Sequence, residues 1–290
     1  MDDYFAVDAL SRSDLKGIVN NVEEWYGRKV GTLPPIQQTK DMAFGSALDF
    51  YLCNGKGPDP IPAGTVMVPD DVLASNGARS TKAYREWLES IPPGTPTLTT
   101  REAQKLLAES DEQLSALMAC EAQIRAHSEA AALMFDETAV HQVSIVFPDP
   151  ETGESLKTLP DIVIPHVGIV DLKTSCEIET GAFLRHCNKF WYDCQAAMGQ
   201  YAWNYEHDEI LPVYFVVVRN KPPYDVVVYK AGEWMLGDGW DRVRYGIEKY
   251  QRCVERGEWR NDSHGQVIEI NEPPRWWSYR NELELESEVG

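Results

Sequence analysis

A carboxylate and an ammonium group stand two residues apart in the segment GIVDLKTS, residues 168–175. Side chains two apart on a β-strand point to the same face, so Asp171 and Lys173 project together. Ten residues before Asp171, the segment LPDIVI places Asp161 on the neighbouring strand of a predicted hairpin, and the turn PHVG brings the two aspartates side by side. Two carboxylates at this range repel each other unless a cation lies between them.

This pattern predicts metal-assisted phosphodiester hydrolysis. Carboxylate oxygens suit Mg²⁺ or Mn²⁺, which bind one or two carboxylates together with substrate phosphate. The ammonium of Lys173 could orient or activate a water or stabilise charge developing on the phosphate. An Asp-x-Lys pair on a strand is usually a solvated face. Pro160-Asp161, followed by Asp171-Leu172-Lys173 between apolar strand runs, is much more specific.

The N-terminal half is predicted to be helical. Residues 9–27 form an amphipathic helix capped by Ser11 or Ser13, and residues 40–55 form a second one that Gly55 ends. Residues 55–97 are rich in Pro and Gly and are predicted to be a long loop around one short helix. Residues 98–134 are predicted to form two helices, with Thr99 and Glu102 as a capping box.

The second half changes to strand periodicity. Residues 141–175 are predicted to form three antiparallel strands, followed by a helix over 190–206. Strands over 210–220 and 224–230 are joined by KPP, and a last helix covers 237–257. The fold class is therefore α/β, a central mixed sheet flanked by helices. We expect one domain over 1–280, helical over 8–135 and catalytic over 140–260, then an acidic, disordered tail, 281–290.

Composition restricts the function classes. The formal net charge of −19 argues against a broad polyanion-binding surface but leaves room for a local basic groove. No apolar run reaches the ~20 residues of a membrane helix, and the N-terminus lacks a signal-peptide pattern, so a cytoplasmic protein without a membrane partner is expected. The six cysteines lack zinc-site spacing, and no phosphate-binding Gly-Lys-Ser/Thr loop indicates ATP use.

Four ordered segments resemble one nuclease family. Asp161 and the DLK segment match the PD-(D/E)xK motif of restriction-endonuclease-like folds. ALSRSDLKGIVNNVEEWY, FGSALDFYL and FWYDCQAAMG resemble further segments of the exodeoxyribonuclease VIII (RecE-like) family, which is related to RecB-type and lambda-type exonucleases. The resemblance covers roughly residues 8–205.

The resemblance implies a role for each matching position. Asp161, Asp171 and the backbone carbonyl of Leu172 would be metal ligands, Lys173 the catalytic lysine, and Gln195 a contact to the site or the DNA end. The positions that depart from the family pattern are Asp49 in place of a metal-binding histidine, Leu159 in place of an arginine, and Gly199 in place of a tyrosine. Asp49 can still bind Mg²⁺. Lys157 could replace the arginine, and Tyr192 or Tyr201 the tyrosine.

The resemblance also implies an activity. It is a Mg²⁺-dependent, ATP-independent exonuclease, with Mn²⁺ as a substitute, that degrades linear duplex DNA from 5′ to 3′ and exposes single strands for recombination. A ring-like homo-oligomer, a single-strand annealing partner and a phage or prophage origin would accompany it, in a bacterial cell or phage-infected host. Only Cys253 follows residue 194, which argues against the iron–sulfur cluster of some relatives.

Two alternatives remain open at this stage. One is an endonuclease of the same fold that acts on single-stranded or structured DNA. The other is a DNA-binding or assembly protein with a decayed site, which Leu159 and Gly199 motivate. For the exonuclease and for both alternatives, basic and aromatic residues are candidate DNA contacts. These residues are Lys157, Arg185, Lys189, Tyr192, Arg79 and Lys82.

Overall fold

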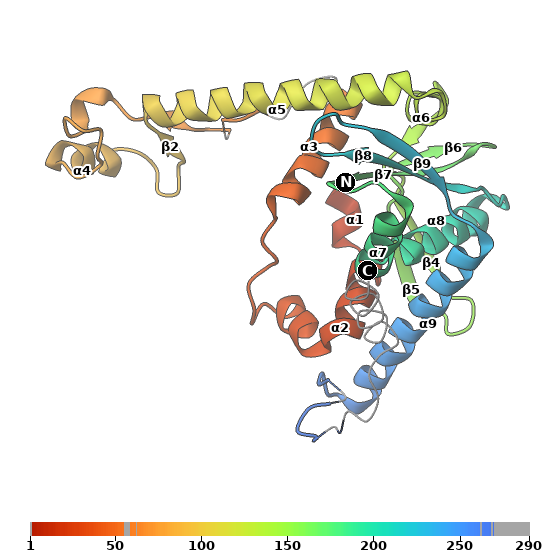
Figure 1. The fold of residues 1–290 in the computed structure, drawn as a ribbon. Helices are drawn as coiled ribbons and strands as arrows, with labels where there is room; N and C mark the ends of the chain where they lie inside the picture. The colour runs from red at the N-terminus through yellow and green to blue at the C-terminus, as the bar shows by residue number, and fades with distance from the viewer. Residues whose placement is uncertain (1, 55–58, 62, 262, 268, 270–290) are drawn as a thin grey trace, which may run out of the picture.

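The computed structural model describes residues 2–54, 59–61, 63–261, 263–267 and 269. Its centre is a five-stranded sheet in the order β3–β6–β7–β8–β9 (Figure 1). The strands are β3 (Val140–His141), β6 (Ile162–Ile164), β7 (Gly168–Ser175), β8 (Val213–Arg219) and β9 (Val226–Lys230). Strands β7 and β8 are parallel and the other neighbours are antiparallel, so the predicted mixed sheet is confirmed.

Alternation along β7 divides the core into two layers. Ile169 belongs to the apolar cluster that includes α2 (Arg12–Lys29), α8 (Tyr192–His207) and α9 (Glu233–Arg256). Val170 belongs to the cluster on the other face, under α3 (Lys40–Asn54), α5 (Thr100–Ala126) and α6 (Ser128–Met134). Asp171 and Lys173 follow Ile169 in the period-two alternation, and they therefore face the α8 layer.

The N-terminal helices form largely where the sequence predicts them. A short helix, α1 (Asp2–Ala6), precedes α2. Ser11 caps α2, and its hydroxyl and Asp14 form a reciprocal capping box. The predicted end of α3 at Gly55 lies outside the described residues. Both α5 and α6 are present, and the capping box of Thr99 and Glu102 begins α5.

Residues between α3 and α5 form an arm rather than only a loop around one helix. It contains β1 (Val66–Met67), the 3₁₀ turn η1 (Asp70–Val72), α4 (Lys82–Glu89) and β2 (Thr97–Leu98). The parallel pairing of β1 with β2 holds it together. Figure 1 shows α4 and β2 at the far end of α5, away from the central sheet.

The prediction of three antiparallel strands over 141–175 was wrong. The segment also contains β4 (Ile145–Pro148) and β5 (Ser155–Thr158), which pair only with each other in a separate two-stranded sheet. Pro160 follows β5 and cannot donate a backbone hydrogen bond, which suits a break between β5 and β6. The chain then enters the central sheet at Asp161.

The C-terminal half has one helix more than predicted, and its last helix begins earlier. A further helix, α7 (Thr180–Phe190), precedes α8, and Trp191 joins them in a left-handed conformation with φ 62°. The helix α9 begins at Glu233, earlier than predicted. The predicted boundary at 280 and the acidic tail 281–290 lie outside the described residues. Among the described helices, none combines the length and apolar character of a membrane span.

Candidate active site

The β6–β7 hairpin places the two motif aspartates across from each other. Ile162 pairs with Val170 in antiparallel register, so Asp161, one residue before β6, stands opposite Asp171. Directly opposite residues in such a pair have Cβ atoms about 5 Å apart. The carboxylates therefore lie together just before the start of β6, where its pairing with β7 ends and β7 continues.

Lys173 and Gln195 converge on the same carboxylate. The Nζ atom of Lys173 lies 2.6 Å from Oδ1 of Asp171. From α8, the side-chain amide of Gln195 donates to the same oxygen at 3.1 Å. Asp171 is only 4% exposed, so these two groups hold a buried charge in one orientation.

The surroundings of Asp161 and Asp171 disfavour the ionisation of both aspartates. Burial, and then the charge of Asp171, raise the pKa of Asp161 well above its ordinary value. Burial alone would lower the pKa of Lys173, but the charges of Asp171 and Asp161 outweigh it and raise that pKa. Lys173 is therefore a protonated donor, and the aspartate pair has an excess of negative charge.

The peptide group of Leu172 faces Asp161. Its N–H donates to Oδ2 of Asp161 at 2.8 Å. The N–H and C=O of one strand residue point to the same edge, and the pairing of β6 with β7 ends at Val170, two residues before Leu172. The carbonyl of Leu172 therefore points to the same open edge, which suits its predicted role as a ligand.

Asp49 lies at the rim of this group. Its Oδ2 accepts a hydrogen bond of 2.8 Å from the side chain of Gln142. The backbone N–H of Gln142 in turn donates to the carbonyl of Asp161 at 2.8 Å. Burial raises the pKa of Asp49, and the charges of Lys173 and Asp171 also act on it.

Gln142 is a residue that sequence reasoning missed. It has a left-handed backbone, with φ 52°, which is uncommon for a residue other than glycine. This conformation lets one residue bind both Asp161 and Asp49. Neither strand periodicity nor a motif distinguishes it, because its partners are remote in sequence.

The donor set fits a hard cation. Oδ2 of Asp171 and Oε1 of Gln195 are buried oxygens without a hydrogen-bond partner, and buried polar atoms normally have one. Asp161 and Asp171 add repelling carboxylates, which a divalent cation would stabilise. In the described part of the chain, no group of three or more His, Cys, Asp or Glu side chains is close enough to hold a metal. The role of Asp49 as a third ligand therefore stays a prediction.

Comparison with known proteins identifies the fold. Residues 80–267 match the model of a family described as "PDDEXK-like domain of unknown function (DUF3799)". The chain belongs to this family. The recognition of a PD-(D/E)xK protein and its fold class are thus confirmed, and family and fold together support a nuclease. Proteins with this fold that are nucleases generally use divalent metals.

One solved structure supports the fold. A "Putative exonuclease" from Eubacterium rectale has a TM-score of 0.54 at 17% identity, over 94% of this chain and 92% of its own. The structure of SSO0001 has a TM-score of 0.32 at 15% identity, over 72% of this chain and 84% of its own. No curated protein matches the chain.

Gly199, where the RecE-like pattern has a tyrosine, packs against the β6–β7 hairpin. Gly199 lies in α8 directly beneath the hairpin, where an added Cβ would be 3.8 Å from Pro160 and 3.9 Å from Ile169. Tyr201 stacks on Trp240 with ring centroids 4.9 Å apart, so it belongs to the core. Tyr192 is the aromatic residue at the PD-(D/E)xK site, because Nζ of Lys173 lies 4.8 Å from its ring centroid.

A group of cations surrounds Phe190, next to Tyr192. The two rings stack with centroids 5.7 Å apart, and Arg12 donates to the carbonyl of Phe190 at 2.6 Å. Nζ of Lys16 and Nζ of Lys189 each lie 5.1 Å from the Phe190 ring centroid. Burial, and then the charges of Arg12 and Lys189, lower the pKa of Lys16. Among the described residues, none of these three cations has an ion-pair partner.

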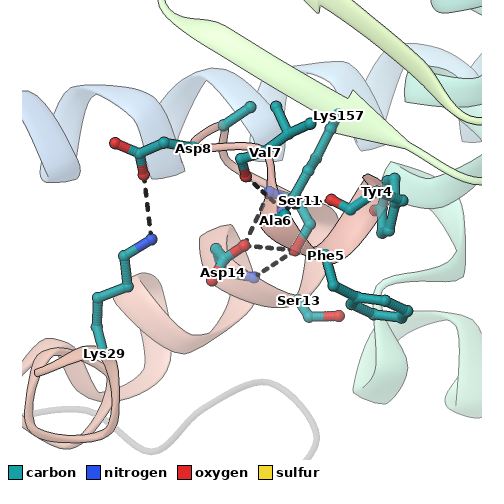
Figure 2. Close-up of a pocket in the computed structure, with 11 residues that line it drawn as sticks. Tyr4, Phe5, Ala6, Val7, Asp8, Ser11, Ser13, Asp14, Lys29 and Lys157 are labelled. Atoms are coloured by element: carbon teal, nitrogen blue, oxygen red, sulfur yellow. Dashed lines mark hydrogen bonds and ion pairs between the residues drawn. The ribbon is translucent and has the colours of Figure 1, made fainter. Parts of the chain in front are cut away.

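Lys157 was predicted to contact DNA, but it is not one of the cations around Phe190. It is 8% exposed, and its ammonium donates to the carbonyls of Tyr4 and Val7 at 3.1 and 2.8 Å. Figure 2 shows the side chain pointing into the N-terminal segment that lines a cavity of about 390 Å³. This lysine anchors the N-terminus, because two backbone acceptors satisfy its charge.

The other predicted DNA contacts are dispersed. Arg79 pairs with Glu102, and Lys82 lies 3.4 Å from Glu86, both on the arm that projects from the sheet (Figure 1). The structure therefore does not bring Arg79 and Lys82 to the site. Arg185 is exposed on α7, 3.7 Å from Glu177. Of the predicted DNA contacts, only Lys189 and Tyr192 lie beside the group of Asp161, Asp171 and Lys173.

Proposed function

We propose that this protein is a Mg²⁺-dependent, ATP-independent exonuclease that acts on the ends of linear duplex DNA. The observation that carries the proposal is the convergence of Lys173 and Gln195 on buried Asp171, beside Asp161, where Oδ2 of Asp171 and Oε1 of Gln195 have no hydrogen-bond partner. The cations and rings around Phe190 and Tyr192 adjoin this group and offer contacts for phosphates and bases.

The residues divide the work of phosphodiester hydrolysis. Asp161, Asp171 and the carbonyl of Leu172 would hold the cation, which supplies Lewis acidity and an activated water. Gln195 fixes the rotamer of Asp171 through its amide hydrogen bond. Lys173, kept protonated by the aspartates, donates to the phosphate or to the attacking water and stabilises negative charge on the phosphate oxygens.

Polarity and cellular role follow from the family resemblance and belong to the same proposal. We infer degradation from the 5′ end, a homo-oligomer around the duplex and a single-strand annealing partner in recombination. The protein would act in the cytoplasm of a bacterium or of a phage-infected host. Mn²⁺ would substitute for Mg²⁺, because both prefer oxygen ligands.

End-labelled DNA tests the proposal. Linear duplexes labelled at the 5′ or the 3′ end are digested with Mg²⁺ beside a covalently closed circle. Early release of 5′ label from linear DNA alone, lost in Lys173→Ala and kept in Lys105→Ala, is expected. Lys105 is the control because it is an exposed lysine on α5, 3.7 Å from Glu109.

Other outcomes identify the alternatives. Cleavage of the circle would replace the exonuclease by an endonuclease with the same site. DNA binding without hydrolysis under any divalent cation would overturn the enzyme proposal and favour a binding protein.

A further inference from the structure

A second group of cations lines a cavity far along α9. The cavity has a volume of about 400 Å³ and lies where the end of α9 meets α2. Figure 1 shows these two helices side by side. Its charged lining consists of Lys249, Arg252, Arg256, Arg260, His264 and one acid, Glu258. On a chain of net charge −19, such a local excess of positive charge requires a physical reason.

Lys249 is the most informative member of this lining. It is 7% exposed, and its ammonium donates to the carbonyl of Val19 at 3.2 Å. Within the described part of the chain it has no carboxylate partner. A buried ammonium without an opposite charge is costly, so an anion in the cavity would stabilise it.

The arginines add unpaired charge at the same place. Among the described residues, Arg252, Arg256 and Arg260 form no ion pair, whereas His264 lies 3.0 Å from Glu23 and is paired. The helix dipole favours a cation such as Arg256 in the last turn of α9. It does not explain why four cations share one cavity. Arginine and lysine together are typical of phosphate binding.

The cavity lies farther along α9 than Arg242, which is held next to the proposed active site. Arg242 of α9 lies 2.6 Å from Asp193, which is two residues before Gln195. Arg252 follows Arg242 by ten residues, or about 15 Å at 1.5 Å per residue. This is the length of about four to five base pairs at 3.4 Å each. The carbonyl of Val19, which accepts from Lys249, lies about one turn of α2 after Lys16, a member of the cation group around Phe190.

We propose that this cavity is a second phosphate-binding site, which holds the DNA backbone about four to five base pairs from the phosphate being cleaved. The proposal rests on the proposed nuclease function. The cations at Phe190 bind the duplex near the catalytic group, and Lys249, Arg252 and Arg256 bind it farther along.

Salt dependence of DNA binding tests the site. The Arg252→Ala/Arg256→Ala variant is compared with Arg101→Ala/Lys105→Ala, which removes the same charge from exposed positions on α5. Both are measured in an Asp171→Asn background by fluorescence anisotropy with a duplex of about 20 base pairs. Each lost phosphate contact reduces the slope of log K against log salt by about 0.9. We expect a reduction of about 1.8 for the first pair and none for the second.

Two further measurements separate this proposal from the proposed function. Hydrolysis of bis-p-nitrophenyl phosphate, which is too small to reach the cavity, should be equal in wild type and Arg252→Ala/Arg256→Ala. Inorganic phosphate in EDTA should raise the Tm of wild type and of Asp171→Asn more than that of the arginine variant. An increase in Tm by phosphate that survives the arginine substitutions would overturn the second site. An unchanged slope of log K against log salt would overturn it too. If wild type neither binds nor cleaves DNA, but the increase in its Tm by phosphate is lost in the arginine variant, the nuclease proposal is overturned and the anion site remains.

Discussion

Replacing Asp161 with Asn should stabilise the metal-free protein while it removes activity. The Asn side chain keeps an oxygen to accept from the N–H of Leu172, now 2.8 Å from Oδ2 of Asp161. Its new amide faces Asp171, whose Oδ2 is buried without a partner. The substitution therefore exchanges a repelling charge for a hydrogen-bond donor and removes a ligand.

The size of the effect follows from the hairpin geometry. Two unit charges about 5 Å apart repel by about 3 kcal/mol at an effective dielectric constant of 20. Nζ of Lys173, 2.6 Å from Asp171, offsets part of this repulsion. A net gain of about 1–2 kcal/mol remains, and at about 2 °C per kcal/mol for a chain of this size it raises Tm by about 2–4 °C.

Thermal unfolding measures this gain directly. Wild type, Asp161→Asn and the exposed control Asp71→Asn are unfolded at pH 8 in EDTA and in 10-fold steps of Mg²⁺. We expect Asp161→Asn to have the highest Tm in EDTA and the smallest increase with Mg²⁺. A Tm in EDTA below that of wild type would refute the reasoning, because it would mean that the carboxylate stabilises the fold without a cation.

Three further substitutions test separate contacts. Gln195→Glu brings a third carboxylate to Asp171, so it should lower Tm in EDTA by several degrees and increase the stabilisation by Mg²⁺, in the same unfolding assay. Tyr51→Phe removes the hydrogen bond that lowers the pKa of Glu121. A lowered carboxyl pKa stabilises the fold above the ordinary value of 4.5, and this stability is lost as the pH falls through the folded pKa. The variant should therefore be about 1 kcal/mol less stable than wild type at pH 7, and the difference should vanish at acid pH in a series of unfolding measurements. Lys157→Met should cost about 2 kcal/mol in urea unfolding without changing DNA affinity, because its ammonium binds two backbone carbonyls.

The β6–β7 hairpin was predictable because its signals are local. A short turn fixes the register, and the period of two then fixes which side chains share a face. Asp161 and Asp171 therefore meet as predicted, and Lys173 follows on the same strand. The capping boxes at Ser11 and Thr99 are local too, since each is complete within four residues.

Features that depend on distant segments were not predictable. Lys157 has the charge and position of a phosphate ligand, but the N-terminal segment folds over it and supplies the carbonyl of Tyr4, 153 residues away. Gln142 acquires its role only when α3 packs on β7, which brings Asp49 to it. The helix α7 was missed because its sequence mixes basic and aromatic residues, and that mixture predicts a DNA contact as readily as a packed helix.

The distribution of charge gives the strongest constraint on how DNA could approach. A chain of net charge −19 repels a polyanion over most of its surface, whereas both cation groups border α2. Repulsion elsewhere and attraction along this helix together would orient a duplex, because the local field exceeds the average one. Salt screens both terms: it weakens the contacts and also relieves the repulsion from the acidic body. The arginine pair at the second site should therefore matter most at low salt, where the acidic body leaves DNA fewest other ways to bind.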